Sequence, residues 1–138
     1  MTNTFDFKDG NGPVPAHQHP NGGGWVADTA TVAATAYVGP DTQVYGNALV
    51  SGNARVYGNA RVFGDALVSK TPVRISRSDG YDFIIVPCAD IVDRIIAGCR
   101  YFTYEEADEH WNREHLMYAE TTIILEALKK LYELQKSP

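Results

Sequence analysis

The chain has 138 residues, of which 44% are hydrophobic, so it is long enough for one domain with its own apolar core. Its net charge of −5 at pH 7 argues against sequence-independent nucleic-acid binding, because that binding requires a basic surface. No stretch approaches the roughly 18 consecutive apolar residues that a membrane-spanning helix needs. We therefore expect neither a nucleic acid nor a membrane as partner.

The cysteines indicate the cellular compartment. The chain contains two, Cys88 and Cys99, and its first 24 residues lack the apolar segment that is typical of an export signal. We expect a cytoplasmic protein with two free thiols, because disulfides are rare in a reducing compartment. A disulfide between the two cysteines, across neighbouring strands, is the less favoured alternative.

Residues 1–24 are rich in glycine, proline, asparagine and histidine, a composition typical of extended and turn structure. We expect an N-terminal arm without a packed element of its own, which Phe5 and Phe7 anchor and which caps the segment that follows. His17 and His19 point the same way if the arm is extended. Two histidines are fewer than the three or four ligands of a typical metal site. We therefore predict neither a metal site nor a cofactor.

Residues 25–72 form a repeat with a period of six. Its most regular positions are valines: Val26, Val32, Val38, Val44, Val50, Val56, Val62 and Val68. A small residue precedes most of these valines by two positions, and glycine followed by asparagine or aspartate recurs between Val44 and Leu67. This period fits neither a helix nor a hairpin. It predicts short parallel strands separated by turns, with glycine allowing positive φ at the bends.

The repeat resembles the hexapeptide-repeat family, in which an aliphatic residue recurs every six positions with a small residue two positions before it. Ala30 before Val32 and Ala48 before Val50 are examples. The resemblance implies a left-handed parallel β-helix of triangular section, with three hexapeptides in each 18-residue coil. Residues 18 apart should then stack. The expected interior ladders are Val26–Val44–Val62, Val32–Val50–Val68 and Val38–Val56.

The residues that flank each valine should point outward, because side chains alternate along a strand. They define three different outer faces. The aromatic face carries Trp25, Gln43 and Arg61 in one row and Ala27, Tyr45 and Phe63 in the other. The leucine face carries Thr31, Leu49 and Leu67, then Ala33, Ser51 and Ser69. The tyrosine–arginine face carries Tyr37 and Arg55, then Gly39 and Tyr57.

These faces supply the candidate binding residues. The Tyr45–Phe63 stack is either a binding platform or cross-coil stacking that stabilises the solenoid, and we favour the second. Arg55 beside Tyr37 predicts a cation–π pair. For a small anionic ligand or a host protein, the candidates are Tyr45, Arg55, Tyr57, Arg61, Phe63 and Arg100.

Residues 73–102 change to a period of two, with Asp79-Gly80 as a turn signal. We expect an antiparallel meander with strands around Ile75 and Phe83 and a third strand over Ile91–Ala97. The segment 98–102 should then lead out of the sheet. This part of the chain is expected to cap the second end of the solenoid.

Residues 103–135 are expected to be helical. Thr103 and Glu106 form a capping box, a break falls near residues 112–115, and the second helix runs from about Met117 to Gln135. Its apolar stripe needs a partner: the meander, the leucine face or the same helix of another subunit. The predicted oligomer or packing face consists of Leu49, Leu67, Ile124, Leu128 and Leu131. A homo-oligomer is expected.

A second resemblance concerns the stretch from Arg94 to Arg100 together with Thr103, Glu106 and the pair His110-Trp111. It resembles a small C-terminal module of uncharacterised bacterial and phage proteins, and it implies no chemistry. The expected domains are thus an arm or cap (1–24), the repeat (25–72) and a β-meander plus two-helix module (73–138). The fold class is mainly β with a C-terminal α part.

The function follows less directly. Many hexapeptide-repeat proteins are trimeric acyltransferases with a histidine base, so the resemblance implies a trimer and an acyl-CoA-dependent acetyltransferase. Here all four histidines (His17, His19, His110 and His115) lie outside the repeat, so no catalytic residue is predicted. We favour a non-catalytic binding protein, a phage-encoded inhibitor or a small-ligand binder. A self-assembling solenoid is a further alternative.

Overall fold

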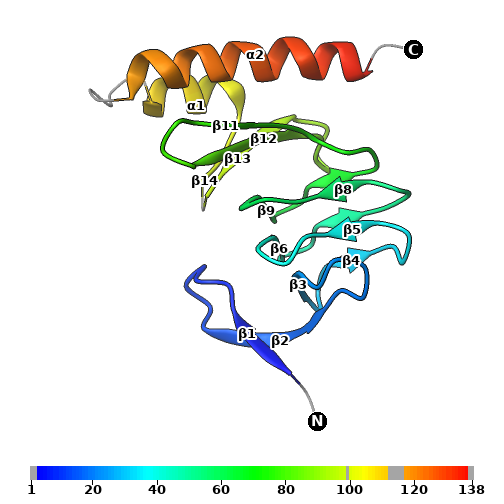
Figure 1. Ribbon diagram of the computed structural model, residues 1–138. Coiled ribbons are helices and arrows are strands. Elements are labelled where there is room, and N and C mark those ends of the chain that lie inside the picture. The colour runs from blue at the N-terminus through cyan, green and yellow to red at the C-terminus, as the bar shows by residue number, and fades with distance from the viewer. Residues whose placement is uncertain (1–2, 99, 112–116, 137–138) are drawn as a thin grey trace.

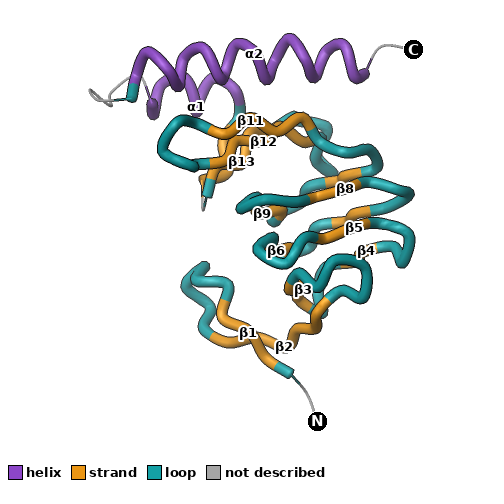
Figure 2. Tube along the Cα trace, viewed as in Figure 1, coloured by secondary structure: helices purple, strands orange, loops and turns teal. Residues whose placement is uncertain are grey.

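The computed structural model describes residues 3–98, 100–111 and 117–136. The fold is mainly β, with two helices at the C-terminal end. Figure 1 shows its layers in chain order: an N-terminal hairpin, a stack of short strands, a four-stranded sheet and the helices. Loops and turns separate the short strands of the stack (Figure 2). In the described parts of the chain, no helix has both the length and the hydropathy to cross a bilayer.

Eight short strands build the repeat: β3 (Trp25–Ala27), β4 (Thr31–Val32), β5 (Tyr37–Val38), β6 (Gln43–Val44), β7 (Leu49–Val50), β8 (Arg55–Val56), β9 (Arg61–Val62) and β10 (Leu67–Val68). They pair in parallel in three ladders, β3-β6-β9, β4-β7-β10 and β5-β8. Each valine pairs with the valine 18 residues away, so the predicted stacking is confirmed. All eight valines are buried except Val32, which is half-buried in the first strand of its ladder.

The turns of the repeat need glycine at one position. Gly46, Gly52, Gly58 and Gly64 have φ values between 62° and 70°, in the left-handed region where a Cβ is unfavourable. The first coil has no glycine at the equivalent positions. There Thr29 and Thr35 donate their hydroxyls to the carbonyls of Gly46 and Gly52 in the next coil. These bonds tie the first coil to the second.

The N-terminal segment differs from the expectation that it has no packed element. It forms a hairpin of β1 (Thr4–Asp6) and β2 (Pro13–Gln18), and β2 pairs antiparallel with β3. The result is a mixed five-stranded sheet in the order β1-β2-β3-β6-β9. Phe7 is buried against Tyr45 in a small core of its own. This tertiary contact overrides the loop-like composition of the segment.

After the repeat, four antiparallel strands form one sheet in the order β11 (Val73–Ser76), β12 (Asp82–Val86), β13 (Arg94–Ala97) and β14 (Arg100–Phe102). The expected third strand over Ile91–Ala97 is too long at its start, because Ile91 lies exposed in a turn with φ 60°. Asp90 holds this turn by accepting the amide N–H of Val92 and by pairing with Arg94. The segment expected to lead out of the sheet instead contributes its fourth strand, β14.

This sheet lies between the solenoid and the helices. Alternate side chains of β12 and β13 point to opposite sides: Ile84, Val86 and Ile96 join the solenoid core, whereas Phe83, Ile85, Ile95 and Ala97 join the helix core. Every residue of β12 is therefore buried. One sheet both closes the end of the solenoid and provides the surface on which the helices pack.

The two helices are α1 (Tyr104–Trp111) and α2 (Tyr118–Lys136). The predicted capping box is confirmed: Thr103 N–H donates to Glu106 and Glu106 N–H donates to Thr103 Oγ1. The predicted break near 112–115 lies outside the described residues. Ile124 and Leu128 are buried against the antiparallel sheet, so they pack within the chain. Leu131, predicted on the same stripe, lies beyond this contact and is 46% exposed.

Candidate functional site

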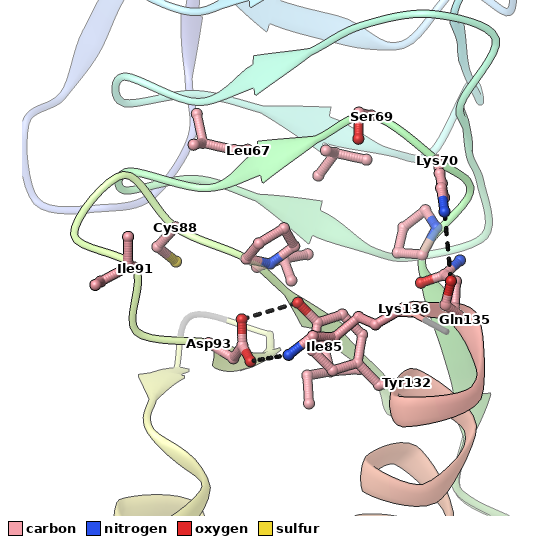
Figure 3. A pocket seen from close by; sticks show the side chains of 14 residues that line it. Leu67, Ser69, Lys70, Ile85, Cys88, Ile91, Asp93, Tyr132, Gln135 and Lys136 are labelled. Atoms are coloured by element: carbon pink, nitrogen blue, oxygen red, sulfur yellow. Dashed lines mark hydrogen bonds and ion pairs between the residues drawn. The ribbon is translucent and has the colours of Figure 1, made fainter. Parts of the chain in front are cut away.

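A cavity of about 550 Å³ lies where the last coil of the solenoid, the loop after β12 and the C-terminal end of α2 meet (Figure 3). We call it the junction cavity. It is lined by Leu67, Val68, Ser69, Lys70, Pro72, Ile85, Val86, Pro87, Cys88, Ile91, Asp93, Tyr132, Gln135 and Lys136. Three segments that are distant in sequence therefore build it.

The cavity exists because the pairing of β10 ends early. On the open side of the last coil, Leu67 N–H donates to Pro87 O, Ala89 N–H donates to Asp65 O, and Ala66 forms a bridge with Cys88. The chain then turns away at Ile91 before it enters β13. The hollow left between β10 and α2 has apolar walls, to which Leu67, Ile85 and other aliphatic side chains contribute.

Polar groups converge at the rim. The Tyr132 hydroxyl donates to Asp93 Oδ1 at 2.8 Å, and Lys136 Nζ lies 3.4 Å from Asp93 Oδ2. Lys70 Nζ donates to the backbone oxygen of Gln135 at 3.3 Å. The charged side chains of the lining are thus two lysines and one aspartate, of which Lys136 pairs with Asp93, so the lining carries a net positive charge. Burial, together with the hydrogen bond to Asp93, raises the pKa of Tyr132 above its ordinary value.

Cys88 contributes its sulfur to the lining (Figure 3). Its side chain is buried and its Sγ accepts a hydrogen bond from the Tyr101 hydroxyl at 3.2 Å. Cys99, the other half of the alternative disulfide, lies outside the described residues. Within the described chain, Cys88 is therefore a free thiol with a hydrogen-bond partner.

The leucine face leads into the mouth of the junction cavity. Leu49 and Leu67 are 38% and 37% exposed, and Leu67 also lines the cavity. The helices pack on the antiparallel sheet instead of this face, so among the described residues the chain itself does not cover it. The other alternative, that a second subunit covers this face, stays a prediction.

The aromatic face is covered at Tyr45, whereas Phe63 is half-buried. Tyr45 is only 3% exposed, because Phe7 of the hairpin stacks on it with ring centroids 4.9 Å apart. The stack continues from Tyr45 to Phe63 at 4.9 Å and to Tyr101 at 5.3 Å. A second hollow of about 450 Å³ beside Lys8 reaches the edges of these rings. The stack itself joins the hairpin, the coils and the sheet.

The arginine candidates lie on other surfaces. Arg55 lies over the Tyr37 ring with Cζ 4.5 Å from its centroid, as predicted. The exposed ring of Tyr57 carries Arg74 in the same way, also at 4.5 Å.

The remaining two arginines are also apart from the cavity. Arg61 is half-buried and donates to Phe7 O at 3.4 Å, and Arg100 is exposed on β14. None of the six predicted binding residues lines the junction cavity.

The histidines give one arrangement that the sequence did not reveal. His17 on β2 and Asp28 after β3 are brought together by strand pairing, with Nδ1 2.8 Å from Oδ1. A carboxylate beside an imidazole can orient a general base. Both side chains are half-exposed, however, and neither lines the two hollows described above.

The other described histidines have structural contacts. The buried His19 ring has Nε2 2.8 Å from Ala36 O, and His110 packs against Phe102 and Trp111. His115 lies outside the described residues. Across residues 3–98, 100–111 and 117–136, no group of three or more histidine, cysteine, aspartate or glutamate side chains is placed to hold a metal ion.

Comparison with known proteins supports the repeat. A family model described as the YdcK beta solenoid repeat matches residues 43–56 and 54–70. The chain is therefore a mainly β protein that contains a β-solenoid-type repeat. No curated protein and no solved structure matches the chain.

Of the residues predicted to form a binding or packing face, only Leu67 lines the junction cavity. The polar rim was missed because Lys70, Asp93 and Lys136 lie in three segments that no shared motif connects. One sequence feature indicates the position of the cavity: the six-residue period ends at Pro72, which marks where the coil stacking stops.

Proposed function

We propose that the protein is a non-catalytic binding protein whose junction cavity holds a small ligand with an apolar body and one anionic group. The observation that carries this proposal is the cavity itself. Its volume of about 550 Å³ lies within the range of small-molecule sites, and it combines apolar walls with a few convergent polar groups.

The rim charge favours an anion. Lys70 and Lys136 both reach the rim, whereas the carboxylate of Asp93 is already engaged by Tyr132 and Lys136. A ligand carboxylate near the two lysines gains charge-assisted hydrogen bonds, and its hydrocarbon part displaces water from the apolar walls. A medium-chain carboxylate such as octanoate has both features.

We propose that the repeat is the rigid support of the junction cavity. The six-residue period, the 18-residue stacking and the solenoid-repeat match support a solenoid of the hexapeptide type, for which we propose left-handed winding. In this account the solenoid is a rigid support that presents the cavity and the leucine face.

The test is calorimetric titration with hexanoate, octanoate and 1-octanol. Each buried methylene contributes about 0.8 kcal/mol, so octanoate should bind about 15-fold more tightly than hexanoate. 1-Octanol, which lacks the charge, should bind about tenfold more weakly than octanoate. The absence of octanoate binding would overturn the proposal.

A matched pair of variants locates the binding. Ser69 is exposed at the cavity, and Ser51 occupies the same row of the leucine face one coil earlier. Ser69→Trp should fill the mouth and weaken octanoate binding strongly, whereas Ser51→Trp should leave it unchanged. Equal effects of both substitutions would place the ligand elsewhere.

The alternatives predict different results with acetyl-CoA and with these compounds. An acetyltransferase would be stabilised by acetyl-CoA, and the substitution His17→Ala would abolish acetyl transfer, since His17 is the histidine that a carboxylate orients. A purely structural solenoid, which the repeat match is also consistent with, would bind none of these compounds.

A further inference from the structure

The solvent side of α2 carries a second apolar stripe, opposite the stripe that packs on the sheet. Ile123 is 67% exposed and Leu134 is 70% exposed, and Leu131 lies beside them. Figure 1 shows α2 as the outermost layer at the end of the molecule opposite the β1–β2 hairpin. The buried side of α2 holds the helix firmly on the sheet, so the outer stripe is presented in a fixed orientation.

The stripe alternates small and large residues at a spacing of four: Ala119, Ile123, Ala127 and Leu131. Residues four apart form a ridge on a helix surface, and ridges of this kind are the usual elements of helix–helix packing. In an antiparallel pair with a two-fold axis at the level of Leu125, Ile123 faces Ala127 of the second copy. Leu131 then faces Ala119 of the second copy. Each large side chain meets a small one.

The charges of α2 are distributed unequally between its two halves, in a way that suits the same two-fold axis. Its N-terminal half, residues 118–127, contains Glu120 and Glu126 and no lysine or arginine. Its C-terminal half, residues 128–136, contains three lysines and one glutamate. The same two-fold axis sets Lys130 at the level of Glu120 of the second copy, a carboxylate that also accepts hydrogen bonds from the N–H and hydroxyl of Ser78. An antiparallel arrangement therefore pairs opposite charges, whereas a parallel one would align like charges.

From this size and charge complementarity we infer that α2 forms the interface of a two-fold homodimer, in which the outer stripes of two copies pack antiparallel. A single helix face buries less than the roughly 1,200–2,000 Å² of a standard interface, so the dimer is weak and depends on concentration. The inference does not depend on the proposed ligand, because the junction cavity is lined by the opposite side of α2, at Tyr132 and Gln135.

The test is sedimentation equilibrium of the full chain from low micromolar to millimolar concentrations. The wild-type protein should approach a dimer, and Leu131→Glu should raise the dissociation constant by about tenfold or more, because it buries an unpaired charge. Leu49→Glu is the matched control, since Leu49 is 38% exposed on the leucine face. It should leave the dimer unchanged. Circular dichroism checks that both variants are folded.

A size exchange tests the proposed register. Ile123→Ala should weaken the dimer, and the double variant Ile123→Ala with Ala127→Ile should restore it, because the large and small residues are then exchanged in both copies. The inference would be overturned by a monomer at all concentrations, by a trimer, or by a dimer that Leu131→Glu does not affect. It would equally be overturned if the protein bound phosphatidylcholine–phosphatidylglycerol vesicles through this stripe without self-association.

Discussion

Asp82 connects the solenoid to the antiparallel sheet, and its substitution gives a quantitative test of this joint. Its side chain is 3% exposed at the start of β12. It accepts hydrogen bonds from Asn59 N–H at 2.9 Å, from Arg74 Nη1 at 3.0 Å and from the hydroxyl of Ser76. Asp82→Asn keeps the shape of the side chain. It removes the charge and turns an amide donor toward groups that are themselves donors.

The expected loss in the free energy of unfolding is large, because Arg74 then lacks its counter-ion. Breaking a buried ion pair by removing one partner costs about 3–5 kcal/mol. The side chain of Arg74 is 25% exposed, so water compensates in part and we expect the low end, about 3 kcal/mol. For a chain of this length, such a loss lowers the melting temperature by roughly 10 °C.

The measurement is urea unfolding of Asp82→Asn beside the control Asp90→Asn. Asp90 also pairs with an arginine, Arg94, but its carboxylate is 47% exposed and solvent screens the pair. The control should therefore unfold at nearly the wild-type urea concentration. If Asp82→Asn is no less stable than Asp90→Asn, the joint does not depend on this buried network and the reasoning is refuted.

Two further predictions concern a turn and a tyrosine. Gly64→Ala should destabilise the protein more than Gly12→Ala does. Both glycines have φ near +67°, a left-handed conformation that costs other residues about 1–2 kcal/mol. Only at Gly64 would the added Cβ also lie 2.7 Å from the Tyr101 ring. Equal losses in thermal unfolding would contradict this. Burial and the hydrogen bond to Asp93 raise the pKa of Tyr132, so the unfolded chain loses this proton at a lower pH than the folded chain does. The free energy of unfolding should thus fall above about pH 10. Urea unfolding at about pH 8 and about pH 11 measures this decrease, and Tyr132→Phe should make it smaller. A decrease of the same size in Tyr132→Phe would show that Tyr132 is not the group responsible.

The repeat was predictable because each coil is built from its own local pattern. Valines at every sixth position are all buried together when the chain forms stacked coils of short strands, and the glycines in the turns allow the bends between the strands. The register between coils then follows from the period. Val26, Val44 and Val62 stack as the sequence predicts, since no distant segment competes for these positions.

The N-terminal hairpin was not predictable from its composition. Its pairing with β3 and the burial of Phe7 depend on Tyr45, which lies in the next coil. The same contact removes Tyr45 from the surface, which is why the outward alternation of the strand did not predict its burial. Alternation gives the direction of a side chain but does not show what covers it.

The junction cavity was the least predictable feature. It depends on where the last coil of the solenoid ends, on the turn at Ile91 and on where the C-terminal end of α2 lies. Each is a property of tertiary packing. A sequence pattern specifies which residues are apolar, but the meeting of Lys70 with the end of α2 requires the folded chain.

Methyl-resolved NMR titration with octanoate tests the binding proposal most directly. The account predicts shift changes confined to the methyl groups that line the junction cavity, such as those of Leu67, Val68 and Ile85, which saturate at one ligand per chain. It also predicts unchanged methyl signals from Val26, in the first coil. Shifts absent from the cavity methyls, or spread evenly over the solenoid, would contradict the account.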